Sequence, residues 1–255
     1  MGHPKTKSDL HHFVTRMGDN ALILGQRVSA WCGHAPVLEE DIALANMALD
    51  LIGQATLWLG YAAEIEGEGR TADDYAFLRD ERQFYNCLLV ETPNGNFGDT
   101  LMRHFLFDSW HYFMLKGLES STDLRVAEIA QKASKEARYH IERSTDLVIR
   151  LGDGTPESHA KMQAALDRLW PFTGELITAD DIDNAMAETG IAPDLKEVAG
   201  QFSDHVKRVL PEAKLMLPEG VYMRTGGKTG VHSEAMGYLL AEMQSVARAH
   251  PGATW

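Results

Sequence analysis

The stretch Lys135-Glu136-Ala137-Arg138-Tyr139-His140, together with Asp108-Ser109-Trp110-His111 about one helix earlier, decides the fold that we expect for this chain. Around the first stretch, core-type residues recur every three or four positions, which is typical of one helix face and places Glu136 and His140 on it. The same spacing centres a second helix face on Asp108. Carboxylates on such faces are costly to bury unless a partner pairs with them. In four-helix bundles, carboxylate-bridged di-iron sites have this character.

A di-iron site in a bundle requires a Glu-x-x-His pair on each of two helices, because residues three apart share a face. The sequence contains no Glu-x-x-His. Tyr139 follows Glu136 at the third position, and Gly53 follows Asp50 in the same way on an earlier helical segment. The chain therefore has the frame of an iron protein without its usual ligands.

We interpret these positions as a degenerate site that needs no metal, in which His, Tyr and Arg side chains satisfy the carboxylates. Its candidate members are Asp50, Gly53, Asp108, His111, Glu136, Tyr139 and His140, with Asp19 or Gln26 as a further contributor. The spacing leaves open whether His111 faces inward or outward. The alternative hypothesis is a divergent di-iron oxygenase or ferroxidase with an unusual ligand set.

Helical periodicity, capping residues and Gly or Pro punctuation predict four long helices. They span residues 10–32, 37–65, 98–119 and 123–151. Only the second and third are joined by a long connection, and this is the connectivity of ferritin-like bundles. In the second helix, the stripe expected to face the core consists of Leu38, Ile42, Ala45, Leu49, Ile52, Thr56 and Leu59.

Further helices are expected after the bundle, at residues 158–169, 179–188, 193–210 and 233–250. No segment shows the sustained alternation of a strand. The sequence thus predicts an all-α fold, a ferritin-like four-helix bundle with additional C-terminal helices. We expect a single domain over residues 1–255, with the bundle core at about 10–151 and the helical extension at about 156–255.

Composition restricts the partners and the compartment. The chain has 255 residues, of which 44% are hydrophobic, and its formal net charge is −13. This charge disfavours nucleic acid or an anionic membrane as a partner. Cys32 and Cys87 are too far apart in sequence for a metal-type spacing, and so few cysteines fit a reducing compartment. Residues 1–8 lack an apolar signal region. We therefore expect a cytoplasmic protein.

Nine short runs distributed over nearly the whole chain resemble the C subunit of the multicomponent phenylacetyl-CoA epoxidases. The runs are Gly18-Asp19-Asn20, Trp31-Cys32-Gly33-His34-Ala35-Pro36, Ala43-Leu44-Ala45-Asn46, Gly53-Gln54-Ala55, Arg79-Asp80-Glu81-Arg82-Gln83-Phe84, Pro93-Asn94-Gly95-Asn96-Phe97, Lys135-Glu136-Ala137-Arg138-Tyr139-His140, Arg224-Thr225-Gly226-Gly227-Lys228 and Leu240-Ala241-Glu242-Met243-Gln244.

This resemblance implies a non-catalytic, ferritin-like subunit in aerobic bacterial phenylacetate breakdown, a pathway of aromatic degradation. It implies pairing with a homologous catalytic A subunit, in which a di-iron centre activates oxygen to epoxidise the ring of phenylacetyl-CoA. Electrons would come from NADPH through a reductase that carries FAD and an iron–sulfur centre. No cofactor is then expected in this chain, and hetero-oligomer formation and self-association are both compatible with the resemblance.

Two further segments are candidates for contacts. The loop with Arg224, Gly226, Gly227 and Lys228 resembles a phosphate loop, but Tyr222 stands where the Walker motif needs glycine and no strand precedes it. We expect either contact with the A subunit or the phosphates of coenzyme A, or simple packing; the turn with Asn94 and Asn96 is a second possible contact. The charged run that begins at Arg79 is interpreted chiefly as a solvated helix face, with an interface as the minor alternative.

Overall fold

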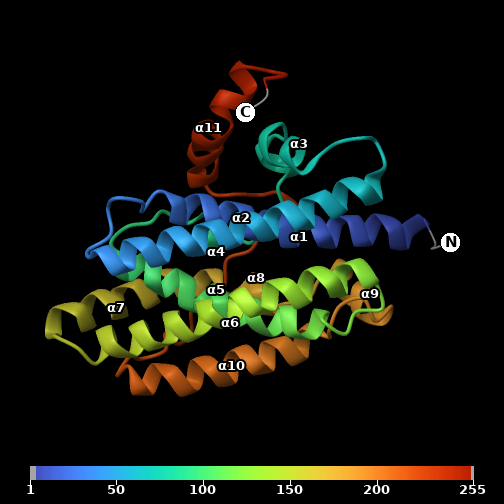
Figure 1. Ribbon diagram of the computed structural model, residues 1–255. Helices are drawn as coiled ribbons and strands as arrows, with labels where there is room; N and C mark the ends of the chain where they lie inside the picture. Colours follow the sequence, from blue (N-terminus) through green and yellow to red (C-terminus); the bar gives the residue numbers. More distant parts are fainter. Residues whose placement is uncertain (1–3, 254–255) are drawn as a thin grey trace. The chain divides into compact units, whose positions relative to one another are not determined.

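The computed structural model describes residues 4–253, and within that range it consists of helices, turns and loops without a strand (Figure 1). The all-α fold expected from the sequence is confirmed. The first three residues of the polar N-terminal segment lie outside the described range. The helices are α1 (Pro4–Ser29), α2 (Leu38–Glu66), α3 (Ala72–Phe77), α4 (Leu88–Glu91), α5 (Phe97–Leu118), α6 (Leu124–Gly152), α7 (Pro156–Leu169), α8 (Gly174–Ile177), α9 (Asp181–Glu188), α10 (Leu195–Glu212) and α11 (Glu234–Ala249), with three short 3-10 helices at Glu81–Gln83, Trp170–Phe172 and Gly227–Thr229.

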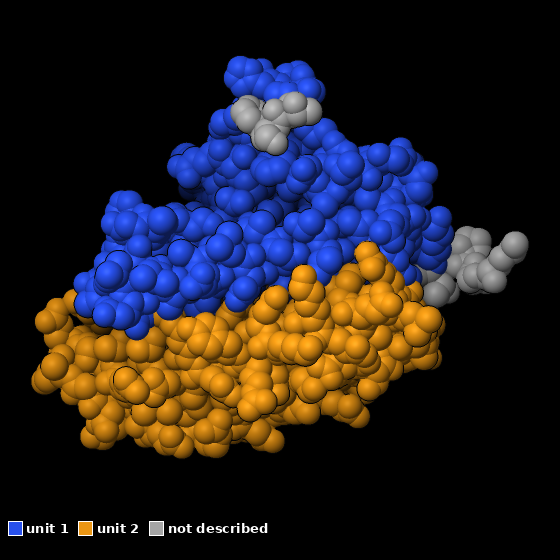
Figure 2. Space-filling model, viewed as in Figure 1, with its two compact units in different colours: residues 1–93, 226–255 blue, residues 94–225 orange. Residues whose placement is uncertain are grey.

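The chain forms two compact units, coloured separately in Figure 2. Unit 1 consists of residues 1–93 and 226–255, and unit 2 of residues 94–225. The segment expected as one helical extension is thus divided, since residues 156–225 belong to unit 2 and residues 226–255 to unit 1. The single domain expected from the sequence, with a bundle core followed by a helical extension, stays a prediction.

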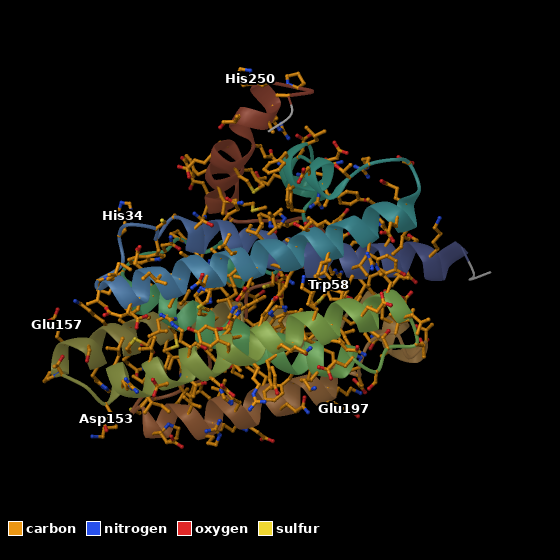
Figure 3. The ribbon with its side chains drawn as sticks, viewed as in Figure 1. His34, Trp58, Asp153, Glu157, Glu197 and His250 are labelled. Carbon is orange, nitrogen blue, oxygen red and sulfur yellow. The ribbon has the colours of Figure 1, made fainter. Side chains whose placement is uncertain are left out.

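In unit 1, α1 and α2 pack along each other, and α3, α4 and α11 pack around them. The core face of α2 is built from Leu44, Met47, Leu51 and Trp58, all almost fully buried (Figure 3 labels Trp58). This is not the face that the sequence predicted. Large apolar side chains lie on both sides of α2, so periodicity alone could not tell which side is covered.

The predicted stripe of α2 lies mostly on the solvent side. Leu38 and Leu49 are 70% exposed and Ile42 is 53% exposed. Thr56 is also exposed, whereas Leu59 is buried as expected. The register predicted for this helix was therefore wrong by about one residue step around the axis.

In unit 2, α5 is buried along most of its length and packs against α6, α7 and α10. Asn96 caps α5 by accepting hydrogen bonds from the backbone N–H groups of Gly98 and Asp99, and Asp123 caps α6 in the same way. These caps fix the start of both helices, and thereby the position of every side chain along them. The four long helices predicted from the sequence agree with α1, α2, α5 and α6 to within a few residues, except that α1 begins about six residues earlier than expected.

Candidate functional site

A buried cluster of imidazoles and one carboxylate occupies the middle of α5. His104, Asp108 and His111 are each 1% exposed, and their spacing of four and three residues places them on one side of the helix. The Nδ1 atom of His104 lies 3.7 Å from Oδ1 of Asp108, too far for a hydrogen bond. Within the described part of the chain, neither oxygen of Asp108 and neither ring nitrogen of His104 has a hydrogen-bond partner.

Helix α6 contributes His140, which is fully buried and lies close enough to affect the charge of both α5 imidazoles. Burial lowers the pKa of His104, although Asp108 opposes the shift. Burial likewise lowers the pKa of His111 to about 3, again against the attraction of Asp108. Both imidazoles are therefore neutral at physiological pH, because the apolar surroundings penalise the charged ring more than one carboxylate favours it.

This cluster differs from the degenerate site that the sequence predicted. Asp108, His111 and His140 are buried, so His111 faces inward. Glu136 was expected to be buried beside His140, but it lies at the edge of the buried face of α6 and is only half-buried. Tyr139 is 51% exposed and does not belong to the core at all.

The α2 members of the predicted site are also away from a core. Asp50 is half-buried, and Gly53 is exposed with no atom within 4 Å of the place a Cβ would occupy. His104 was missed, although its spacing of four residues from Asp108 on a buried helix was a signal that could have found it.

The donor set does not fit a di-iron centre. Such a centre requires several carboxylates directed to one point, and this cluster offers Asp108 alone. Over residues 4–253, no group of three or more His, Cys, Asp or Glu side chains is arranged to hold a metal ion.

Asp19, expected as a contributor to the predicted site, belongs to a separate network in unit 1. Its carboxylate is fully buried and pairs with the guanidinium of Arg79, with one N···O distance of 3.1 Å, and also accepts the backbone N–H of Tyr85. Arg79 is only 4% exposed and stacks over the ring of Phe84 at 4.1 Å. The interpretation of the charged run as a solvated face was therefore wrong for Arg79. Gln26, the other proposed contributor, is half-buried.

A second buried charge pair in unit 1 joins α4 to the segment before α11. The carboxylate of Glu91 accepts hydrogen bonds from Nδ1 of His232 (2.7 Å), from the backbone N–H of Ser233 (2.6 Å) and from the side-chain amide of Asn86 (3.1 Å). Nε2 of His232 donates to the carbonyl of Phe84 at 2.9 Å. Burial lowers the pKa of His232, but the bonds to Glu91 and Phe84 outweigh this and raise it. Because both ring nitrogens face acceptors, the imidazole is held in its protonated form.

The glycine-rich loop is explained in part by packing within unit 1. Gly226 has φ of +142°, which L side chains rarely adopt. A Cβ at Gly227 would clash with the carbonyl oxygen of Asn86. The backbone carbonyl of Lys228 accepts a hydrogen bond from Arg16 at 3.2 Å. Contact of this loop with a partner or with coenzyme A stays a prediction.

The other residues of the predicted contact, Arg224, Asn94 and Asn96, belong to unit 2 and also have structural roles. Arg224 is exposed, and its guanidinium lies over the ring of Phe172 at 5.1 Å. Asn94 accepts a hydrogen bond from Arg103 at 2.6 Å, and Asn96 caps α5.

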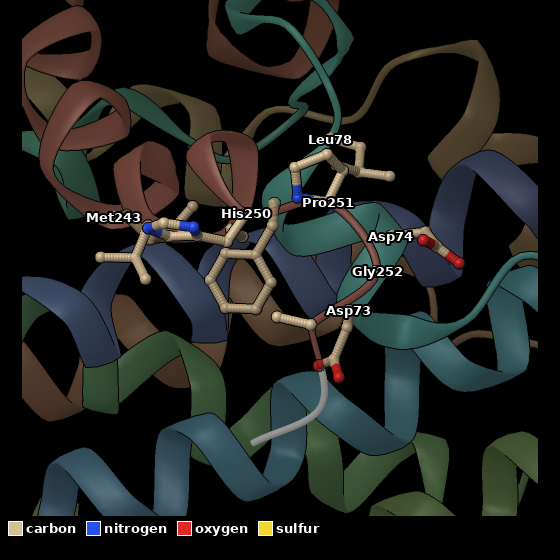
Figure 4. Close-up of a pocket in the computed structure, with 11 residues that line it drawn as sticks. Asp73, Asp74, Leu78, Met243, His250, Pro251 and Gly252 are labelled. Atoms are coloured by element: carbon tan, nitrogen blue, oxygen red, sulfur yellow. The ribbon is translucent and has the colours of Figure 1, made fainter.

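Among the described residues, four pockets are lined by residues of a single unit, and the two with the greatest volumes are described next. In unit 1, a cavity of about 360 Å³ opens between α3 and α11, and its lining includes Asp73, Asp74, Leu78 and Met243 (Figure 4). In unit 2, a cavity of about 640 Å³ lies among α5, α6 and α10. At its wall, His205 bonds to Thr145, and burial lowers the pKa of His205 to about 4. Neither pocket contains the buried cluster of α5, so neither gives a substrate access to it.

Comparison with known proteins identifies the family. The family described as "Phenylacetic acid catabolic protein" matches residues 2–255. The chain is 50% identical over 248 residues to the C subunit of 1,2-phenylacetyl-CoA epoxidase from Escherichia coli strain K12, an alignment that covers 97% of this chain and 100% of the relative. The family match over residues 2–255 includes every helix given above. The chain therefore belongs to the phenylacetic acid catabolic protein family.

Proposed function

We propose that this chain is the structural, non-catalytic C subunit of a bacterial phenylacetyl-CoA epoxidase, which pairs with the iron-bearing catalytic A subunit and stabilises it. The observation that supports this most directly is the 50% identity to the E. coli epoxidase's C subunit over the whole of that protein. In this proposal the four long helices α1, α2, α5 and α6 form a ferritin-like four-helix bundle. The protein works in the cytoplasm, in phenylacetate catabolism.

The chemistry of the buried cluster is in agreement with a non-catalytic role. Asp108 is the one carboxylate of the cluster, and a di-iron centre in a four-helix bundle needs several carboxylates directed to one point. The iron would reside in the A subunit, and the NADPH, FAD and iron–sulfur chemistry in a separate reductase. The residues of the cluster would then serve folding alone.

We also propose that Arg224 and Lys228 contact the partner subunit or the phosphates of the CoA thioester, with Asn94 and Asn96 at the rim. Arg224 is exposed and carries its charge on a side chain supported by Phe172. Guanidinium and ammonium groups are the usual partners of phosphate. The packing of Gly226 and Gly227 would hold the loop in position for such a contact.

The proposal is tested by co-expressing the chain with an A-type epoxidase subunit and measuring the mass and iron content of what is purified. We expect a stable complex that contains iron, and an isolated chain with substoichiometric iron and no turnover. Stoichiometric iron with a di-iron absorption band in the isolated chain would instead support a divergent oxygenase or ferroxidase. The absence of any complex would favour a freestanding helical protein unrelated to oxygenation.

A further inference from the structure

Helix α2 presents a long uncharged face to solvent. The face contains Leu38, Ile42, Asn46, Leu49, Gly53 and Thr56, which are exposed, and Gly60, which is half-buried. These positions recur every three or four residues and so lie on one side of the helix. From the first to the last, the face is about 33 Å long at 1.5 Å per residue. Its large apolar side chains, Leu38, Ile42 and Leu49, are 70%, 53% and 70% exposed, and exposed apolar groups gathered on one face mark an interaction site.

The apolar content of α2 exceeds what packing within this chain uses. By length and composition α2 could cross a membrane, yet only 44% of its most apolar window is buried. The core of unit 1 is already supplied by the opposite side of the helix, through Met47, Leu51 and Trp58. The solvent face therefore has no role in the fold described here.

Two glycines shape this face. A Cβ at Gly53 or at Gly60 would have no atom within 4 Å. Neither glycine has a positive φ, so neither is required by the backbone of this chain. Glycine inside a helix costs about 1 kcal/mol relative to alanine. Placed seven residues apart, the two glycines leave hollows two turns apart that can receive side chains from a neighbouring helix.

The charges around the face argue against two of its possible occupants. Acidic residues lie at both ends of α2, with Glu39, Glu40 and Asp41 in its first turn and Glu64 and Glu66 in its last. A second copy laid along the face in either direction would bring carboxylates together. Helices that bind a membrane usually carry basic residues near their ends, and α2 has none in its first or last turn.

We infer that this face of α2 is the docking surface for an apolar helix of the catalytic A-type subunit, one with large aliphatic side chains for the two glycine hollows and basic residues near its ends. The inference rests on the proposed function, because it names the part of this chain that the partner covers. It makes Leu49, at the centre of the face, the residue on which binding depends most.

The first experiment changes the face without changing the fold. Leu49→Glu is expected to weaken binding of the co-expressed A-type subunit by at least about 100-fold, the size of effect found at the centre of an interface. Leu124→Glu is the matched control, since Leu124 is 79% exposed at the start of α6 and outside the face. Binding is measured by titration of the purified chains, and folding by thermal unfolding of each variant.

The outcomes separate the inference from the proposed function. If the unchanged chain and Leu124→Glu bind the partner and Leu49→Glu does not, the inference holds. If Leu49→Glu binds as tightly as the control, the α2 face is not the docking surface, although the proposed function survives. If the unchanged chain binds no A-type subunit, both fail.

A second measurement remains decisive if Leu49→Glu does not fold. In a chain with the exposed Cys32→Ser, the thiol introduced by Leu49→Cys should react rapidly with maleimide in the free protein and slowly in the complex, while that of Leu124→Cys should react equally in both. Equal reactivity of Leu49→Cys in both states overturns the inference. So does protection of Leu49→Cys in the free chain by self-association, or by vesicles of phosphatidylcholine and phosphatidylglycerol, because the face would then belong to a second copy or to a bilayer.

Discussion

The imidazole of His232 lies 2.7 Å from the carboxylate of Glu91, and neither side chain is accessible to solvent although 141 residues separate them in sequence. The pair fastens the segment before α11 to α4. Removing one member of such a pair leaves a buried charge uncompensated, which costs several kcal/mol.

The first prediction concerns the pH dependence of this pair. The folded-state pKa of His232 is raised, so its contribution to the free energy of unfolding is complete below the unfolded value of 6.5 and is lost as pH rises through the folded value. His232→Gln should therefore destabilise the chain by about 2–3 kcal/mol at pH 6, and by less at pH 8.5. Urea unfolding of both proteins at the two pH values measures this difference. An equal loss at both values would contradict the protonated state assigned here.

The second prediction concerns His111, whose pKa is lowered to about 3. Here the unfolded chain binds the proton more readily, so stability is complete above pH 6.5 and falls below it. Between pH 6.5 and pH 5, His111 should account for a loss of about 2 kcal/mol, at 1.36 kcal/mol per unit. His111→Phe cannot take up a proton, and its stability should fall less over this range in chemical denaturation. A variant as acid-sensitive as the unchanged chain would exclude His111 as the cause.

The third prediction concerns Asp108, whose buried oxygens have no hydrogen-bond partner among residues 4–253. Asp108→Asn removes a charge that burial disfavours and should leave stability unchanged or raise it by about 1–2 kcal/mol. Thermal and urea unfolding at pH 7 give the comparison. A loss of stability would mean that the carboxylate compensates a positive charge in the folded protein.

The fourth prediction compares two glycines of opposite surroundings. Gly227→Ala would place a methyl group against the carbonyl of Asn86 and should destabilise unit 1 by about 1–3 kcal/mol. Gly200→Ala, in the exposed interior of α10, meets no atom within 4 Å and should stabilise the chain by up to about 1 kcal/mol. Denaturation midpoints of the two variants should thus move in opposite directions.

The fifth prediction tests the contact proposed for the glycine-rich loop. Arg224→Glu with Lys228→Glu should weaken binding of the A subunit or raise the Michaelis constant for the CoA thioester in the reconstituted enzyme, while the isolated chain stays folded. Reversal of both charges is used because a phosphate or acidic partner is then repelled. If this double variant has wild-type kinetics, the loop only packs within the chain, and the proposed contact is wrong.

The positions of the long helices were predictable because their ends carry local signals. Asn96 and Asp123 cap α5 and α6 through contacts with residues two or three positions away, and such contacts are visible in sequence. The side of each helix that is covered was less predictable. On α2 both sides are apolar, and on α6 Glu136 lies one position away from the buried face.

The buried charge pairs could not be predicted from sequence at all. Asp19 and Arg79 are 60 residues apart, and Glu91 and His232 are 141 apart. Each of these residues looks like an ordinary surface charge in its local context, and only tertiary packing brings the partners together.

The apolar side chains on both sides of α2 also affect the steady-state amount of this protein in a cell. If the α2 face is the proposed docking surface, a chain without its partner would expose the leucine and isoleucine side chains of α2 to chaperones and proteases, which act on such surfaces. Its steady-state abundance would then follow the supply of the partner rather than its own rate of synthesis. Excess copies would be removed by turnover, which keeps the two kinds of subunit in balance.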